Sequence, residues 1–170
     1  MTTNANTTVK TKINKILYAS DIEKGSRPAF RAAMSLCGKH ESEITYLHIL
    51  EPLSSSAQNL IKSLVDTKDV EGIYQKSLVN LKAKIEERIG HFFEQEIEFH
   101  DSLDISKIKS RIEEGVAWET ILKVADDIDA DVIIMGTRTH SAVGQFFSGS
   151  TANKVMLNTK IPLLIIPLCK

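Results

Sequence analysis

Short apolar runs recur along the chain, and most are followed by a longer stretch in which apolar residues step by threes and fours. The runs predict strands, because a strand that is covered on both faces is apolar at successive positions. We expect strands at residues 15–20, 43–50, 108–114, 131–135 and 163–166.

The stepping pattern predicts amphipathic helices between these runs. The clearest begins at Val70 and keeps one apolar stripe as far as Phe92, opposite a charged face. Ser26 is a suitable N-cap for another helix, since its hydroxyl can accept from the first backbone N–H groups. Residues 51–67 contain a loop and only a hint of a short helix. The expected helices cover residues 26–39, 70–92, 118–127 and 152–157.

Strands that alternate with helices indicate βαβ units, and therefore a parallel sheet with right-handed crossovers and helices on both faces. A length of 170 residues is that of one domain. The predicted organisation is a polar, flexible N-terminal arm at residues 1–12 and a single α/β domain at residues 13–170.

Composition argues against several classes of partner. With 21 basic and 22 acidic residues the net charge is −1, and no basic block is available for nucleic acid. No apolar run has the length of a membrane span, and the N-terminus lacks the apolar core of a secretory signal. Cys37 and Cys169 form no Cys-x-x-Cys pair, and the histidines have no metal-site spacing. We therefore expect a reduced, cytoplasmic protein without a metal site of its own.

The residues after the fourth predicted strand have the character of a phosphate-binding loop. Met135 and Gly136 end that strand, and a glycine there lets the chain turn sharply with φ > 0. Gly149 begins the next helix, where bare backbone N–H groups and the helix dipole attract an anion. The hydroxyls of Ser150 and Thr151 can donate to phosphate oxygens as well. A Gly-Ser pair alone is weak evidence, since glycine also ends strands for steric reasons.

In context, these residues resemble the universal stress proteins, whose ATP-binding members have Gly-x2-Gly-x9-Gly-Ser/Thr after the fourth strand. This chain keeps that spacing, with two residues between Gly136 and Thr139 and nine between Thr139 and Gly149-Ser150. Threonine stands in place of the second glycine. The resemblance extends over most of the chain. Its other segments are residues 15–21, 46–50, 114–117, 130–136 and 161–167.

The resemblance implies a Rossmann-like sheet of strand order 3-2-1-4-5, similar to that of the adenine nucleotide alpha hydrolases. Ligands of such sheets bind at the carboxyl ends of the strands where the order reverses, here between the first and fourth strands. Ala19, Ser20 and Asp21 would line one side of that crevice, and Met135 and Gly136 the other.

Several of these residues have a structural explanation beside the functional one. Asp21 either contacts the nucleotide or its metal, or it caps the turn into the first helix. Ile49 either offers its backbone to the adenine edge or is plain core. Thr139 would be strained where a family glycine has φ > 0, because β-branched residues avoid that region. Arg138 and His140 either meet a phosphate or are exposed loop residues.

Two functions stay open. The first is a cytoplasmic regulatory protein of the stress response that binds ATP, or AMP or ADP, with Mg²⁺. The second is a dimeric interaction protein of the same fold that binds no nucleotide, which Thr139 favours. Dedicated catalysis is not expected, because the chain has neither a Walker Gly-x4-Gly-Lys-Ser/Thr nor a Gly-x-Ser-x-Gly motif. The predicted nucleotide-binding residues are Ala19, Ser20, Asp21, Ile49, Met135, Gly136, Thr139, Gly149, Ser150 and Thr151.

The last predicted strand would lie at one edge of the sheet. Leu163, Leu164, Ile165 and Ile166 include no charge to protect that edge, and Pro167 is expected to end the strand rather than block it. Antiparallel pairing with the same strand of a second copy would cover it, and the resemblance also implies a homodimer. In the alternative, the N-terminal arm or the C-terminal tail covers the edge of a monomer.

Overall fold

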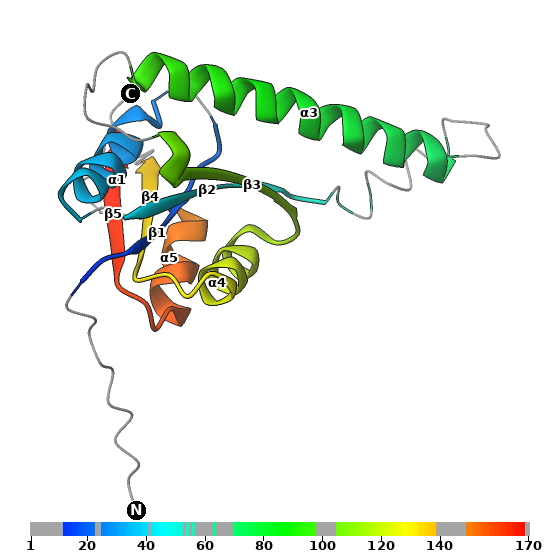
Figure 1. The fold of residues 1–170 in the computed structure, drawn as a ribbon. Helices are drawn as coiled ribbons and strands as arrows, with labels where there is room; N and C mark the ends of the chain where they lie inside the picture. Colours follow the sequence, from blue (N-terminus) through cyan, green and yellow to red (C-terminus); the bar gives the residue numbers. More distant parts are fainter. Residues whose placement is uncertain are drawn as a thin grey trace, which may run out of the picture.

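Five parallel strands form one sheet in the order β3-β2-β1-β4-β5, which confirms the predicted order (Figure 1). The structure is a computed structural model of the chain. It describes residues 12–22, 25–40, 42–52, 54, 56, 63, 70–97, 105–138 and 149–168. The strands are β1 (Lys15–Ala19), β2 (Glu43–Leu50), β3 (Ile108–Glu114), β4 (Val132–Arg138) and β5 (Leu163–Leu168).

Helices cover both faces of the sheet, as predicted. In Figure 1, α1 and α3 lie above the strands, and α4 and α5 lie below them. Among the described residues, no helix is both long enough and apolar enough to cross a membrane. The bounds are α1 (Arg27–His40), α3 (Val70–Ile97), the 3-10 turn η1 (Ile105–Lys107), α4 (Ala117–Asp127) and α5 (Ser150–Asn158).

The core has an aromatic side and an aliphatic side. Between the sheet and helices α1 and α3, Phe30 stacks on Phe93 with ring centroids 5.4 Å apart, and Tyr18 meets Tyr46 edge-on at 5.1 Å. Between the sheet and helices α4 and α5 the buried side chains are aliphatic, with Ile133 at the centre. Each large apolar side chain that is fully buried contributes about 1.5–3 kcal/mol to folding.

The apolar stripe of α3 is buried over only part of its length. Ile85 and Ile89 are buried, as predicted, whereas Leu81 is 44% exposed and its neighbour Val79 is 66% exposed. Figure 1 gives the reason, since the N-terminal part of α3 projects past β3 and no strand lies beneath it. The predicted stripe is therefore only partly buried in the first half of this helix, where Tyr74 and Leu78 are half-buried and Leu81 is exposed.

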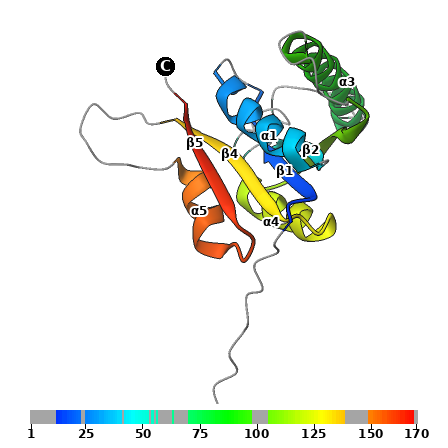
Figure 2. The ribbon, with the colours of Figure 1, turned by 60° about the vertical axis from the view of Figure 1, so that its left-hand side comes forward.

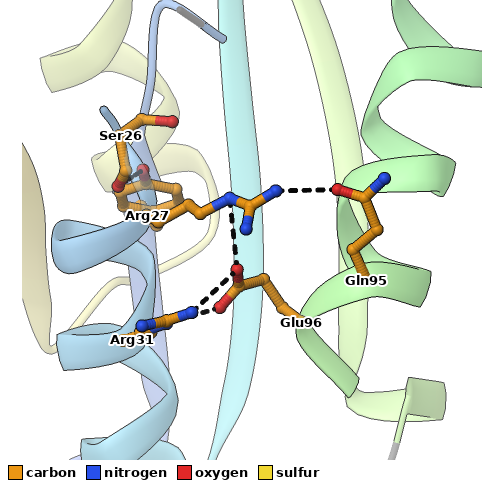
Figure 3. A network of polar contacts seen from close by, with 6 residues as sticks. Ser26, Arg27, Arg31, Gln95 and Glu96 are labelled. Atoms are coloured by element: carbon orange, nitrogen blue, oxygen red, sulfur yellow. Dashed lines mark hydrogen bonds and ion pairs between the residues drawn. The ribbon is translucent and has the colours of Figure 1, made fainter. Parts of the chain in front are cut away.

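An ion-pair cluster ties the start of α1 to the end of α3 (Figure 3). The Glu96 carboxylate is fully buried and lies 2.7 Å from Arg31 Nε and 3.4 Å from Arg27 Nε. Arg27 Nη2 also donates to the side-chain oxygen of Gln95 at 2.7 Å. A buried charge is tolerated only when it is paired and hydrogen-bonded, so these contacts set the position of α1 against α3.

Two strands extend further than the sequence predicted. β4 continues through Gly136 to Arg138, and β5 continues through Pro167 to Leu168. In this longer pairing Gly136 lies opposite Ile166, and Thr137 lies opposite Pro167. Proline has no N–H to donate, but β5 is at the edge of the sheet (Figure 2), where a strand has one unpaired side and accepts proline. Pro167 thus lies inside the strand that it was expected to end.

Some predictions concern residues outside the described part of the chain. The expected N-terminal arm is among them except for Lys12, and so are Thr139, His140 and Cys169. Cys37, by contrast, is buried in α1 as predicted, and its Sγ donates to the Ser42 carbonyl at 2.8 Å.

Candidate functional site

A cavity of about 490 Å³ opens at the carboxyl ends of β1 and β4, where the strand order reverses. Its walls come from the ends of β1, β2 and β4 and from the first turns of α4 and α5. All the predicted nucleotide-binding residues that the structure describes line it, and Thr139 lies outside the described residues. The other lining residues are Tyr18, Ser26, Leu47, His48, Glu51, Ala117, Ile121, Thr137, Ala152 and Leu168.

The turn after β1 has an unusual backbone. Ile22 has a φ of 60°, a conformation that a β-branched residue rarely adopts. Two hydrogen bonds hold it there, one from its N–H to the Ser20 hydroxyl at 3.2 Å and one from Arg88 Nη2 to its carbonyl at 3.4 Å. Such strain costs about 1–3 kcal/mol and persists where surrounding contacts impose it, as they do beside ligand sites. Asp21, which lines the cavity, precedes Ile22 directly.

The Ser20 side chain points to the aromatic side of the core. Its hydroxyl is hydrogen-bonded to the hydroxyls of Tyr18 and Tyr46, and burial raises the pKa of both tyrosines. Tyr18 also donates to the Ser26 carbonyl at 3.1 Å, which accepts from the Ala29 N–H in the first turn of α1. Both phenols therefore stay protonated at neutral pH. Ser20 is thus the centre of a hydrogen-bond network that holds the turn.

The end of β2 forms the opposite wall. His48 Nδ1 lies 2.9 Å from the Ser20 carbonyl and donates to it, because a carbonyl oxygen can only accept. Ile49 lines the cavity and packs with the aliphatic side of the core, so its role as a core residue is confirmed and its contact with adenine stays a prediction. A Glu51 oxygen accepts from the Ala117 N–H at 3.3 Å. The N-terminus of α4 is therefore already paired with a carboxylate.

Gly136 has a different role from the predicted one. It lies within β4 and does not have a positive φ, so the expected sharp turn is wrong. A Cβ at this position would lie 2.5 Å from Leu168 Cδ1 and 2.9 Å from its Cγ, so the Leu168 side chain would have to move. Packing against Leu168 of the neighbouring strand therefore favours glycine here.

Gly149 precedes the first residue of α5 with a φ of −49°, which any residue can adopt. A Cβ there would meet only Thr137 Oγ1, at an ordinary contact distance of 3.8 Å. Neither the backbone nor the packing of the described residues requires glycine, whereas close approach of a ligand would. Its N–H was predicted to be bare, but it donates to Thr137 Oγ1 at 2.9 Å.

The first turn of α5 is the wall best suited to an anion. No side chain of the described residues caps it, whereas Glu51 accepts from the first N–H of α4, and Ser150 and Thr151 line the cavity. The uncapped N–H groups and the helix dipole favour negative charge. Among the described residues no group of three or more His, Cys, Asp or Glu could hold a metal ion.

The comparison with known proteins agrees with this architecture. A model of the universal stress protein family matches residues 12–167. The chain belongs to this family. The universal stress protein MJ0577 of Methanocaldococcus jannaschii is 24% identical over 156 residues, which cover 89% of this chain and 93% of that protein.

Solved structures of universal stress proteins share the fold. The protein UspA from Lactobacillus plantarum has a TM-score of 0.66 at 18% identity, with 92% of this chain and 99% of that chain covered. A universal stress protein crystallised in complex with cAMP has a TM-score of 0.56 at 14% identity, with 94% and 100% covered. At these identities the likeness establishes the Rossmann-like α/β fold and no residue role.

The structure adds site residues that the sequence did not single out. Thr137 follows Gly136 in β4, and strand alternation places it on the same face as Ile133 and Met135. That alternation was readable from the sequence, but the expected end of the strand at Met135 hid it. His48 and Glu51 carried no such signal, because their partners come from distant segments.

Proposed function

We propose that this universal stress protein binds an adenine nucleotide, ATP or its mono- or diphosphate, in the cavity between β1 and β4. The observation that carries the proposal is the α5 wall. It combines an uncapped helix N-terminus with Gly149, where the fold itself does not require glycine. Both features suit a phosphate group that approaches the backbone closely.

Charge and polarity in the cavity support one orientation of the ligand. Glu51 already occupies the N-terminus of α4, so the phosphates belong at α5. Leu47 and Ile49 of β2 and Ile121 of α4 give the cavity an apolar wall, which suits the flat faces of a purine. Asp21 follows the end of β1 and lines the cavity, where it could accept from a ribose hydroxyl.

The class of ligand has support from a relative. A protein of the same fold was crystallised with cAMP, an adenine nucleotide. For ATP, Mg²⁺ would arrive with the phosphates, which together with water supply the oxygen ligands that it prefers. Asp21 is the cavity carboxylate that could accept from one of those waters. Binding would act by changing the stability or the partners of the protein, which makes the proposed role regulatory, in the cytoplasm and within the stress response.

Calorimetric titration with ATP and MgCl₂ tests the proposal, after the purified protein has been denatured and checked for released nucleotide. We expect one site per chain. Gly149→Val should weaken binding at least about 30-fold, since its side chain would occupy the space that a phosphate needs while leaving the fold intact. Gly90→Val is the matched control, because a Cβ at Gly90 in α3 meets nothing within 4 Å.

Two outcomes would contradict the proposal, the first for nucleotide binding itself and the second for the placement of the phosphates at α5. The first is a wild-type protein that purifies without nucleotide and shows neither binding heat nor a higher Tm with millimolar ATP, ADP or AMP, because a ligand of the folded state must stabilise it. The second is unchanged affinity in Gly149→Val.

A two-fold dimer through β5 is a second candidate function. β5 is an edge strand, and Leu164 on it is 37% exposed, whereas Ile165 packs against the aliphatic side of the core. Pro167 removes one donor near the end of this edge and leaves the preceding residues able to pair. Light scattering at tens of micromolar should give a dimeric mass. Leu164→Lys should give a folded monomer, whereas Ile165→Lys should destabilise the fold, and a monomeric wild type would refute the dimer.

A further inference from the structure

We propose that Thr137 is a specificity-determining residue of the cavity, whose hydroxyl is oriented by the Gly149 N–H and donates its proton to an anionic oxygen of the ligand. This inference rests on the proposed nucleotide binding and assigns one residue the recognition of its phosphate end. The side chain lines the cavity and is only 7% exposed, so it has a defined position.

The direction of the hydrogen bond leaves the hydroxyl proton available. The Gly149 N–H can only donate, so Thr137 Oγ1 accepts in their 2.9 Å contact. A hydroxyl has one proton to donate in addition to its lone pairs. Among the described residues, none accepts that proton. The Thr137 hydroxyl accepts one hydrogen bond and still has a proton to donate. It is therefore suited to a ligand atom in the cavity that accepts a hydrogen bond.

The surroundings decide which kind of acceptor fits. Thr137 lies beside the uncapped first turn of α5, where the helix dipole favours negative charge. A hydroxyl that accepts from an N–H also becomes a better donor, because bonds in such a chain polarise one another. The hydrogen bond from the Gly149 N–H to Thr137 Oγ1 would therefore strengthen the bond from the Thr137 hydroxyl to a phosphate oxygen, and the reverse also holds.

The simpler explanation is that Thr137 only fastens the start of α5 to the end of β4. The two roles differ in how they depend on the charge of the ligand. A fastening role would affect nucleotide and nucleoside alike, because both need the same cavity shape. A donor to phosphate would affect only ligands that have one.

The test compares ATP and AMP with adenosine in calorimetric titrations of wild type, Thr137→Val and Thr137→Ser. Valine keeps the shape but has no hydroxyl, and serine keeps the hydroxyl. We expect Thr137→Val to bind ATP and AMP about 10-fold or more weakly, as for loss of a hydrogen bond to a charged group, with adenosine affinity unchanged within about twofold. Thr137→Ser should stay close to wild type.

Three results would overturn the assignment. They are an equal loss of affinity for adenosine, unchanged affinity for ATP, and tighter ATP binding by Thr137→Val, which would mean that the hydroxyl competes with phosphate for Gly149. Wild-type protein that binds none of the three ligands would instead remove the proposed function, and this inference with it. If Thr137→Val does not fold, Thr137→Ala gives the same comparison.

Discussion

On the β1 side of the cavity, side chains from several elements converge on one short turn, whereas on the α5 side the backbone itself forms the wall. The turn at Ile22 is held by Ser20 from β1 and by Arg88 from α3, and His48 of β2 binds the carbonyl just before it. The α5 wall has one comparable side-chain bond among the described residues, between Gly149 and Thr137.

This difference predicts which substitutions should change the stability of the fold and which should change the affinity for ligand. A turn with a strained residue keeps its shape only because distant contacts impose it, so its substitutions should act mainly on stability. A helix N-terminus keeps its N–H groups in place through its own backbone, so its substitutions should act mainly on the ligand.

The largest effect on stability is expected at the ion-pair cluster behind the β1 side. Arg31→Met leaves the buried Glu96 carboxylate with Arg27 at 3.4 Å. We expect the free energy of unfolding, measured in urea, to fall, but by less than for a fully buried pair because Arg31 is half exposed. Lys82→Met is the control, since loss of the exposed Lys82–Glu114 pair should lower the free energy of unfolding much less. Equal losses in both variants would mean that burial of the carboxylate is unimportant.

The two serines of the cavity give the most direct comparison. Ser20→Ala removes the hydroxyl that Ile22, Tyr18 and Tyr46 share, and should lower the free energy of unfolding by about 1–2 kcal/mol. Ser150→Ala removes an exposed hydroxyl in α5 and should change stability by less than about 0.5 kcal/mol. Its ATP affinity should nevertheless fall roughly 3- to 10-fold. The contrast between the β1 side and the α5 side is wrong if both substitutions change only stability or both change only ATP affinity.

The smallest effect is a pH dependence in alkaline solution. Burial raises the pKa of Tyr46 in the folded protein, so the folded state holds this proton more tightly than the unfolded state does. The resulting stability is complete below the unfolded pKa of about 10 and is lost as the pH rises towards the folded value. Between pH 9 and 11 the free energy of unfolding should therefore fall more steeply for wild type than for Tyr46→Phe. Parallel slopes would show that Tyr46 does not titrate in this way.

Much of the fold was predictable because burial imposes a pattern on the sequence. Parallel strands covered on both faces are apolar at successive positions, and this signal is clear for β1, β4 and β5 but absent from β3, whose sequence is mostly polar. The order of the strands needed the family resemblance. The boundaries of β4 and β5 were wrong because Gly136 and Pro167 are local breakers, whereas pairing between two distant segments carries both strands past them.

The candidate site was predictable to the extent that it depends on backbone position. Asp21, Met135 and Ser150 line one cavity because the carboxyl ends of parallel strands meet at one edge of the sheet. Thr137 was missed, because nothing near it in the sequence indicates that its hydroxyl meets the N–H of Gly149. Thr139, the residue that departs from the family motif, lies outside the described part of the chain.

Sequence alone therefore specified the alternation of strands and helices and, through the family motif, the place of the cavity, because both follow from local burial and chain geometry. Tertiary structure decided which contacts the individual residues of the cavity make. Gly136 leaves room for Leu168 of the neighbouring strand, and Ser20, which lines the cavity, is also hydrogen-bonded to two tyrosines. It also decided that the α3 stripe is only partly buried before Ile85. Such contacts join residues far apart in the chain, so no local pattern of apolar and polar residues encodes them.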